Sequence, residues 1–347
     1  MKIKHMNIKD LVRSNILNLK PYSSARDEFQ GEASVFLDAN ENPLNNPFNR
    51  YPDPLQRSLK KIVAEMKHVD ESYLFFGNGS DEPIDLVYRI FCEPQKDNVV
   101  AMDPSYGMYM VCADINNVEY RKVLLKEDFS LDVDKMLSAA DINTKVLFLC
   151  SPNNPTGNDV SKEDVIRILE EFPGIVVIDE AYIDFSDRES YIEKLPKYKN
   201  LIILQTFSKA WGLASVRLGM AFASPEIISY FNKVKYPYNI NLLTQNFVEK
   251  EIKQQERKTG WVKMIIEQRY VLIQNLKKLS LVKKIYHSDA NFVLIKVDNA
   301  NEVYSYLVDK GIIVRNRNNI SLCLGCLRIT VGIPEENARL IEELKNY

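Results

Sequence analysis

The stretch that decides the fold reads Gln205-Thr-Phe-Ser-Lys-Ala-Trp-Gly-Leu-Ala-Ser-Val-Arg-Leu-Gly219, directly after the apolar run Leu201–Leu204, which predicts a buried strand. Lys209 can form a Schiff base with a carbonyl group. Ser208 and Arg217 can bind a phosphate, the arginine through a bidentate fork. A small molecule with one carbonyl and one phosphate fits all three groups, and pyridoxal 5′-phosphate is such a molecule. For this stretch alone, a surface lysine beside a structural arginine is the alternative.

A second apolar run, Ile175–Ile178, ends in Asp179 and is followed three residues later by Tyr182. At the carboxyl end of a strand, Asp179 can pair with the pyridine nitrogen of the cofactor and keep it protonated. The protonated ring withdraws electrons from the carbon that loses its proton. Tyr182 can hydrogen-bond the ring hydroxyl. The structural alternatives are a helix-capping carboxylate and a packing tyrosine.

A third apolar run, Val146–Cys150, leads into Ser151-Pro-Asn-Asn-Pro-Thr-Gly157. The prolines, asparagines and glycine of this segment predict a rigid turn. Asn154 precedes a proline, which biases its backbone to extended geometry and lets its side-chain amide be held toward a ligand. An ordinary turn would explain the segment alone. In series with Asp179 and Lys209, it predicts part of the same site.

The segment Gly77-Asn-Gly-Ser-Asp81 supplies a further anchor for the phosphate. Gly79 lets the backbone come close to a ligand, and Ser80 or Asp81 begins a predicted helix. The free N–H groups and the dipole at a helix N-terminus attract an anion. An ordinary helix cap is compatible with this role.

Alternating apolar strands and amphipathic helices predict an α/β fold with a mostly parallel central sheet and helices on both faces. Ligands bind beyond the carboxyl ends of such strands, where Asn154, Asp179 and Lys209 fall. A helical stretch over Leu242–Lys278 is expected to lead into a smaller α+β domain. We therefore expect an N-terminal arm over residues 1–30, a large cofactor-binding domain over 31–240 and a small C-terminal domain over 241–347.

The length and composition of the chain exclude several classes of protein. A chain of 347 residues exceeds the size at which one core stops growing, so two domains are expected. A net charge of −2 gives no sign of a nucleic-acid or membrane surface. No apolar run approaches the roughly 20 residues that span a bilayer, and no signal-peptide core is present, so we expect a cytoplasmic protein. The pair Cys323 and Cys326 has no second pair or nearby histidine, so no metal is expected.

The motifs SPNNPTG, DEAY and TFSKAWGLASVRLG, in this order and at these intervals, resemble those of the fold-type I pyridoxal-phosphate aminotransferases over nearly the whole chain. Four segments more narrowly resemble histidinol-phosphate aminotransferases: Lys20–Arg26, Leu37–Pro43, Arg50–Pro54 and Cys326–Gly332. The resemblance implies pyridoxal 5′-phosphate as cofactor. It also implies transamination of L-histidinol phosphate with 2-oxoglutarate, giving imidazole-acetol phosphate and glutamate in histidine biosynthesis.

The same resemblance assigns two tyrosines. It implies that Tyr106 stacks over the cofactor ring, where the residues alone would predict a turn tyrosine. It also implies that Tyr51 reaches the cofactor phosphate of the neighbouring subunit, so that the active site needs a homodimer. Packing of Tyr51 within its own chain is the alternative.

Substrate recognition rests on arginines. Arg328 lies on a predicted strand, and its guanidinium suits a carboxylate or a phosphate equally. The resemblance implies that Arg328 holds the substrate anion, that Arg315 and Tyr22 help to hold the phosphate, and that Asn40 lines the pocket. From the residues alone, Arg317 is no worse a candidate than Arg315 for the second anion-binding arginine.

Three other functions remain open. A threonine-phosphate decarboxylase or an aromatic amino-acid aminotransferase could use the same scaffold and the same anion pocket. A non-catalytic, cofactor-binding regulator is disfavoured because Lys209 is intact and only about 30 residues precede the fold, too few for a DNA-binding domain.

Overall fold

A seven-stranded sheet forms the centre of the computed structural model, which describes residues 7–23, 29, 31 and 33–347. The strand order is β1-β7-β6-β5-β4-β2-β3. The strands are β1 (Leu74–Asn78), β2 (Asn98–Asp103), β3 (Glu119–Leu124), β4 (Thr144–Cys150), β5 (Ile175–Asp179), β6 (Leu201–Thr206) and β7 (Leu218–Ala223). Strands β2 to β6 pair in parallel, whereas β7 is antiparallel to both β6 and β1. The predicted mostly parallel sheet is confirmed.

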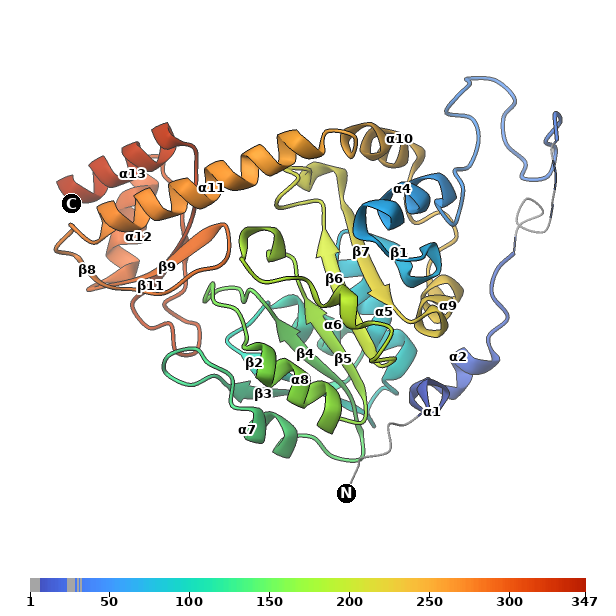
Figure 1. Ribbon diagram of the computed structural model, residues 1–347, viewed down its shortest axis with the longest axis horizontal. Helices are drawn as coiled ribbons and strands as arrows, with labels where there is room; N and C mark the ends of the chain where they lie inside the picture. Colours follow the sequence, from blue (N-terminus) through green and yellow to red (C-terminus); the bar gives the residue numbers. More distant parts are fainter. Residues whose placement is uncertain (1–6, 24–28, 30, 32) are drawn as a thin grey trace.

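Helices cover both faces of this sheet (Figure 1). Helix α5 packs against α6 and α9, and α7 packs against α8. The helices of this part of the chain are α1 (Ile8–Leu11), α2 (Ser14–Asn18), α4 (Arg57–Lys67), α5 (Asp81–Phe91), α6 (Met108–Ile115), α7 (Val133–Ser138), α8 (Lys162–Glu171) and α9 (Pro225–Val234). The β-α-β order explains the arrangement, because each crossover between parallel strands places its helix on a face of the sheet.

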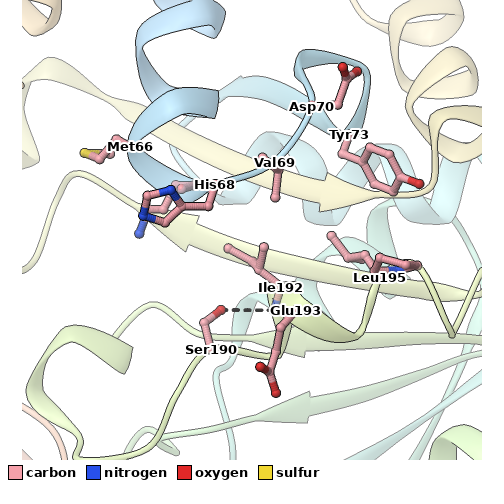
Figure 2. Close-up of a pocket in the computed structure, with 11 residues that line it drawn as sticks. Met66, His68, Val69, Asp70, Tyr73, Ser190, Ile192, Glu193 and Leu195 are labelled. Carbon is pink, nitrogen blue, oxygen red and sulfur yellow. Dashed lines mark hydrogen bonds between the residues drawn. The ribbon is translucent and has the colours of Figure 1, made fainter.

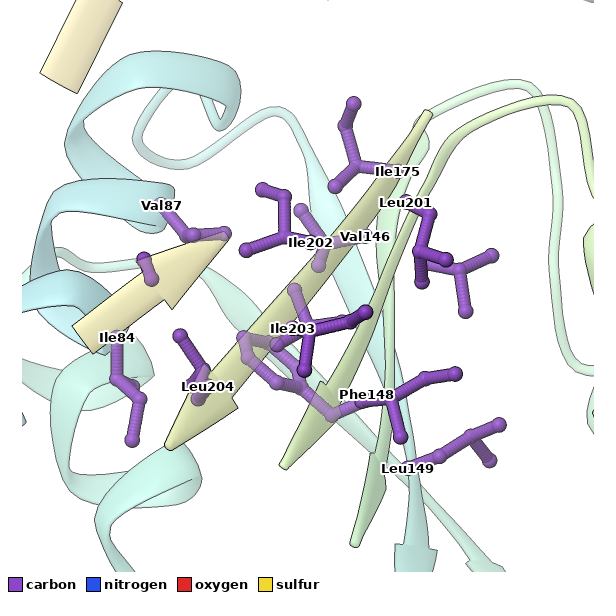
Figure 3. Close-up of a cluster of buried hydrophobic side chains, with 14 of the residues drawn as sticks. Ile84, Val87, Val146, Phe148, Leu149, Ile175, Leu201, Ile202, Ile203 and Leu204 are labelled. Atoms are coloured by element: carbon purple, nitrogen blue, oxygen red, sulfur yellow. The ribbon is translucent and has the colours of Figure 1, made fainter. Parts of the chain in front are cut away.

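The large core lies between the sheet and these helices. Strands β5 and β6 are buried along their whole length, as expected for strands covered on both faces. Figure 3 shows this cluster, which joins Ile84 on α5 to Phe148 on β4 and Ile203 on β6. Because these strands are buried on both faces, their positions are well defined. The loops that follow their carboxyl ends are positioned with them.

A second sheet, of four antiparallel strands, forms the smaller unit that the sequence predicts. Its strand order is β10-β11-β9-β8. The elements are β8 (Val282–Ile285), β9 (Phe292–Val297), α12 (Ala300–Asp309), β10 (Arg315–Asn316), β11 (Cys326–Thr330) and α13 (Pro334–Asn346). This unit has its own buried cluster, to which Val293 and Ile295 of β9 belong.

The single helical stretch predicted over Leu242–Lys278 is wrong, because the structure has two helices, α10 (Leu242–Glu251) and α11 (Gln255–Leu276). Ile252, just after α10, is buried in the large core, whereas Leu272 of α11 is buried in the small one. The break lets each helix pack into a different core. Helix α11 then spans from the large sheet to the small sheet (Figure 1).

Three further observations bound the fold. Among the described residues, no helix combines the length and the apolar composition that crossing a bilayer requires. All five cysteines are buried and free of disulfides. Residues 1–6, 24–28 and 30 of the predicted N-terminal arm lie outside the described residues, and the bounds of the three predicted domains stay predictions.

Candidate active site

Three neighbouring strands end at the candidate active site. Strands β4, β5 and β6 are adjacent and parallel, so their carboxyl ends meet at one edge of the sheet. Asn154 follows β4, Asp179 ends β5 and Lys209 follows β6. All three line one cavity of about 130 Å³. The same cavity is lined by seven other predicted cofactor residues: Gly79, Ser80, Asp81, Tyr106, Tyr182, Ser208 and Arg217.

One wall of the cavity is suited to an anion. Gly79 has a φ of +69°, and a Cβ there would lie 2.5 Å from Arg217 Nη2. A Cβ on Gly219 would lie 2.3 Å from the backbone of Gly79 and Ser80, so both positions need glycine. Ser80 makes no side-chain cap on α5, so the first N–H groups of this 11-residue helix keep their hydrogen-bonding capacity beside Arg217.

Asp179 is only 3% exposed, and both of its carboxylate oxygens accept hydrogen bonds. Tyr109 Oη donates to Oδ2 at 2.8 Å, and the backbone N–H of Ala181 donates to Oδ1 at 3.0 Å. Burial raises the pKa of Asp179 to about 6, whereas these two hydrogen bonds and the charge of Lys209 favour the ionised form. At neutral pH the carboxylate is therefore ionised and can pair with a protonated ring nitrogen.

Lys209 lies against Tyr182, with Nζ 5.5 Å from the ring centre. Burial, and after it the positive charge of Arg328, lowers the pKa of Lys209, so more of the amine is neutral and nucleophilic. Burial also raises the pKa of Tyr182, so its hydroxyl keeps its proton and remains a hydrogen-bond donor. The ring of Tyr182 meets the ring of Phe292 edge-on at 5.2 Å, which joins the cavity wall to the small sheet.

The small sheet reaches the cavity through Arg328 on β11. Arg328 Nη1 donates a hydrogen bond to Asn154 Oδ1, and its guanidinium carbon lies 5.1 Å from the centre of the Phe292 ring. Arg315 on β10 stands directly opposite Arg328 but is exposed. An arginine that could hold a substrate anion thus lies within hydrogen-bonding distance of a residue that lines the cavity.

Comparison with known proteins agrees with this geometry. The family model for class I and II aminotransferases matches residues 25–344. The chain is 57% identical to a histidinol-phosphate aminotransferase from Bacteroides thetaiotaomicron, over 98% of this chain and 99% of that protein. The chain belongs to the histidinol-phosphate aminotransferase family of class I and II aminotransferases.

Other members of this family and its fold relatives extend the comparison. A histidinol-phosphate aminotransferase from Flavobacterium johnsoniae is 52% identical, over 98% of each chain. The crystal structure of the histidinol-phosphate aminotransferase from Clostridium acetobutylicum has a TM-score of 0.80 at 25% identity, covering 86% of this chain and 90% of that one. The L-threonine-O-3-phosphate decarboxylase from Porphyromonas gingivalis, at 22% identity and a TM-score of 0.74 over 86% of this chain and 90% of that one, shares the fold.

Besides Arg315 and Arg328, three residues that the family resemblance assigns do not line this cavity. Tyr51 is 52% exposed and stacks on Tyr238 with ring centres 4.5 Å apart. Asn40 lines a separate groove together with Tyr51. Tyr22 is 69% exposed. The parts that these residues play in the active site of this aminotransferase stay predictions.

The sequence analysis misses several residues of the site, and two of them make hydrogen bonds to predicted site residues. Thr206 lines the cavity and donates a hydrogen bond to Ser208 Oγ at 3.0 Å. Its position two residues before Ser208, at the end of the strand, is the signal that could have found it. Tyr109, which lies in a helix and 70 residues earlier in the chain, donates a hydrogen bond to Asp179. No local sequence pattern predicts that hydrogen bond.

A larger groove, of about 610 Å³, lies between the C-terminal end of α4 and the short 3₁₀ helix η3 (Tyr191–Lys194) (Figure 2). Its lining includes Met66, Val69 and Ile192, and the backbone N–H of Ile192 donates to Ser190 Oγ at 3.2 Å. The groove shares no lining residue with the candidate site. The volume of a cavity therefore does not identify the candidate active site of this aminotransferase. The smaller cavity is the candidate because it brings together a lysine, a carboxylate and a site suited to an anion.

Proposed function

We propose that this chain catalyses the pyridoxal-phosphate-dependent transamination of L-histidinol phosphate with 2-oxoglutarate, giving imidazole-acetol phosphate and glutamate in histidine biosynthesis. The observation that carries the proposal is that Lys209, Asp179 and the N-terminus of α5 line one cavity, beside Arg328 of the small sheet. Relatives that are 57% identical over nearly the whole chain carry the name of this activity, which supports the choice of substrate.

The residues of the cavity fit pyridoxal 5′-phosphate. Gly79 and Gly219 keep side chains out of the anion site, where the N–H groups of α5 and Arg217 can hold a phosphate. Lys209 can bind the aldehyde carbon, and Asp179 can pair with the ring nitrogen. When bound, the cofactor supplies an electron-withdrawing ring that stabilises the charge left on a substrate carbon as its proton leaves.

Lys209 acts as the general base and acid of both half-reactions. Burial and Arg328 lower its pKa, which lets the neutral amine take a proton from the substrate carbon and return it at C4′ of the cofactor. Asp179 remains ionised and holds the ring nitrogen protonated. Tyr182 keeps its phenolic proton and can donate it in a hydrogen bond to the ring oxygen.

Arg328 holds the anionic end of each substrate in turn. Its planar guanidinium can bind the phosphate of histidinol phosphate or a carboxylate of glutamate through two parallel hydrogen bonds. Arg315, opposite Arg328 on β10, is placed to assist it. The hydrogen bond to Asn154 connects Arg328 to the loop after β4. The same loop therefore positions both a substrate-binding residue and a cofactor-binding residue.

We expect a homodimer in which Tyr51 serves the site of the neighbouring subunit. Residues 33–50 lie at the edge of the molecule, away from both sheets (Figure 1), and carry exposed apolar side chains such as Val35, Leu37 and Leu44. A second copy would remove these side chains from water. A cytoplasmic location stays a prediction from the sequence.

The test is an assay of the purified protein with histidinol phosphate and 2-oxoglutarate. Glutamate and imidazole-acetol phosphate in equal amounts are the expected products. Release of carbon dioxide from threonine phosphate, without glutamate, would assign the chain to the decarboxylases instead. Faster transamination of phenylalanine or tyrosine than of histidinol phosphate would assign it to the aromatic aminotransferases, and the absence of all three reactions would contradict an enzymatic function.

A further inference from the structure

Three arginines share one face of the small sheet. Arg315 on β10 stands directly opposite Arg328 on β11, and Asn316 stands opposite Leu327. The backbone N–H of Arg317 donates to the carbonyl oxygen of Cys326 at 2.9 Å, which extends the ladder by one residue. Because side chains alternate between the faces of a sheet, Arg315, Arg317 and Arg328 lie on the same face.

This face is turned toward the large domain. Arg328 stands opposite Leu294 on β9, and Leu294 belongs to the large core cluster together with Cys326. The alternate residues of β9, Val293 and Ile295, belong to the separate core of the small unit. The arginine face therefore looks toward the part of the large domain that holds the active site.

The three guanidinium groups lack carboxylate partners within the described part of the chain. Among the described residues, no carboxylate oxygen lies within ion-pairing distance of Arg315, Arg317 or Arg328, and Nε of both Arg317 and Arg328 is buried without a hydrogen-bond acceptor. Several other arginines of the chain have such a partner, as Arg188 has in Glu180. Buried donors without acceptors are rare in folded proteins, so this place suits an anionic ligand.

The charges around Arg317 indicate which kind of ligand fits there. Burial, and after it the neighbouring charges of Arg328 and Arg315, lower the pKa of Arg317 to about 10. Tyr182, which lines the active-site cavity, is close enough to Arg317 and Arg328 for both charges to favour its ionised form. A cluster of three cations next to the cavity suits a ligand group that carries more than one negative charge.

We infer that Arg317 is a third anion-binding side chain of the substrate pocket, beside Arg315 and Arg328, and that it selects a phosphate dianion over a carboxylate. This inference rests on the proposed function for the identity of the phosphate-bearing substrate. A carboxylate carries a single charge and two oxygens, which Arg328 alone can satisfy with two parallel hydrogen bonds. A phosphate monoester carries close to two charges and three oxygens at neutral pH, and so has room for a further guanidinium.

The test compares Arg317→Gln with wild type on two amino donors, histidinol phosphate and glutamate. For histidinol phosphate, kcat/KM should fall by ~10- to 100-fold, mainly through KM, as expected for the loss of a charge-assisted hydrogen bond or two. For glutamate it should change by less than about threefold. Arg317→Lys keeps the positive charge but cannot form two parallel hydrogen bonds. Its kcat/KM for histidinol phosphate should therefore lie between those of wild type and Arg317→Gln. Arg339→Gln, which alters an exposed arginine of α13, should match wild type on both donors.

The pH dependence of KM distinguishes phosphate binding by Arg317 from a purely structural role. The phosphate monoester loses its second proton near pH 6, so the wild-type KM for histidinol phosphate should improve as the pH rises through that value. Arg317→Gln should flatten this dependence. Equal losses on both donors, an unchanged pH dependence or unchanged kinetics would each overturn the inference.

The inference can fail separately from the proposed function. If the wild-type holoenzyme does not consume histidinol phosphate, the proposed function fails, and inorganic phosphate then decides the role of Arg317. Calorimetric titration of the holoenzyme should show phosphate binding that weakens by about tenfold or more in Arg317→Gln and stays unchanged in Arg339→Gln. Equal phosphate affinity in wild type and Arg317→Gln would overturn the role of Arg317.

Discussion

Tyr109 Oη donates a hydrogen bond to Asp179 Oδ2 at 2.8 Å, and neither side chain has more than 3% of its surface exposed. The bond joins α6 to the carboxyl end of β5. It favours the ionised form of a carboxylate whose pKa burial raises to about 6. The Tyr109 ring is held in turn, because it stacks on Phe148 with ring centres 4.8 Å apart. Tyr109 therefore positions Asp179 and keeps it ionised, without lining the cavity itself.

Replacing Tyr109 with phenylalanine should move the pH dependence of turnover. Loss of the donor raises the pKa of Asp179, so a higher pH is needed to ionise it, and the acid limb of kcat/KM should shift upward. A hydrogen bond to a charged group is worth at least ~1.5 kcal/mol, which corresponds to about one pH unit. The measurement is the pH profile of kcat/KM, followed below and above the acid limb of the wild type.

Tyr88→Phe is the matched control. Tyr88 is equally buried and also stacks on Phe148, but its hydroxyl donates a hydrogen bond to the backbone carbonyl of Tyr109 and not to Asp179. It should lower stability without moving the acid limb. An identical shift in both variants would show that packing, and not the hydrogen bond to Asp179, sets the profile.

Asp179→Asn should lower kcat by orders of magnitude, with a smaller effect on cofactor affinity. The amide keeps the shape of the side chain but removes the negative charge that holds the ring nitrogen protonated. The measurements are kcat and the dissociation constant of the cofactor. A variant within a few-fold of wild type would remove Asp179 from the mechanism.

Gly219→Ala should impair both folding and cofactor binding. A Cβ at this position would lie 2.3 Å from the backbone of Gly79 and Ser80, so the anion site would have to open. Overpacking of this kind costs about 1–3 kcal/mol, visible as a lower melting temperature and a weaker cofactor affinity.

Gly260→Ala provides the contrast to Gly219→Ala. Gly260 lies in α11, and a Cβ at this position would point into open space. Alanine favours a helix over glycine by ~0.5–1 kcal/mol, so this variant should melt at the wild-type temperature or above. A Gly219→Ala protein that keeps wild-type stability and cofactor affinity would show that the loop before α5 is not a tightly built anion site.

The homodimer prediction can be tested by complementation. If Tyr51 acts in the neighbouring site, mixing Tyr51→Phe subunits with Lys209→Ala subunits produces dimers in which one site carries both defects and the other carries neither. Activity should then rise above the average of the two parents. Subunit exchange is verified with a mass tag, and a mixture no more active than that average would place Tyr51 outside the neighbour's site.

The candidate active-site residues on the strand ends can be predicted from the sequence because each belongs to a short local pattern. Asn154, Asp179 and Lys209 each follow or end an apolar run, and parallel pairing brings such ends together. Strand β3 escapes prediction because its run Glu119–Leu124 is mostly polar, as suits the edge of the sheet. Strand β1 is short and runs directly into the glycine loop, so it offers little periodicity.

What the sequence could not supply are contacts between distant segments. The pairing of Tyr109 with Asp179 depends on how α6 lies across the sheet. Arg317 resembles a loop charge until the register of β10 and β11 places it on the same face as Arg328. The chain breaks between α10 and α11 because the two helices pack into separate cores. A run of helix-forming residues does not predict which core each part will join.

We propose that Lys209 is the residue that binds the cofactor covalently. Burial lowers the pKa of two other lysines, Lys60 and Lys67, which makes them chemical competitors that lie outside the site. Borohydride reduction of the holoenzyme followed by peptide mass mapping distinguishes the three. We expect one reduced adduct per chain, on the peptide that contains Lys209, and none in Lys209→Ala. An adduct on Lys60, Lys67 or any other lysine of the wild type, with Lys209 unmodified, would contradict it.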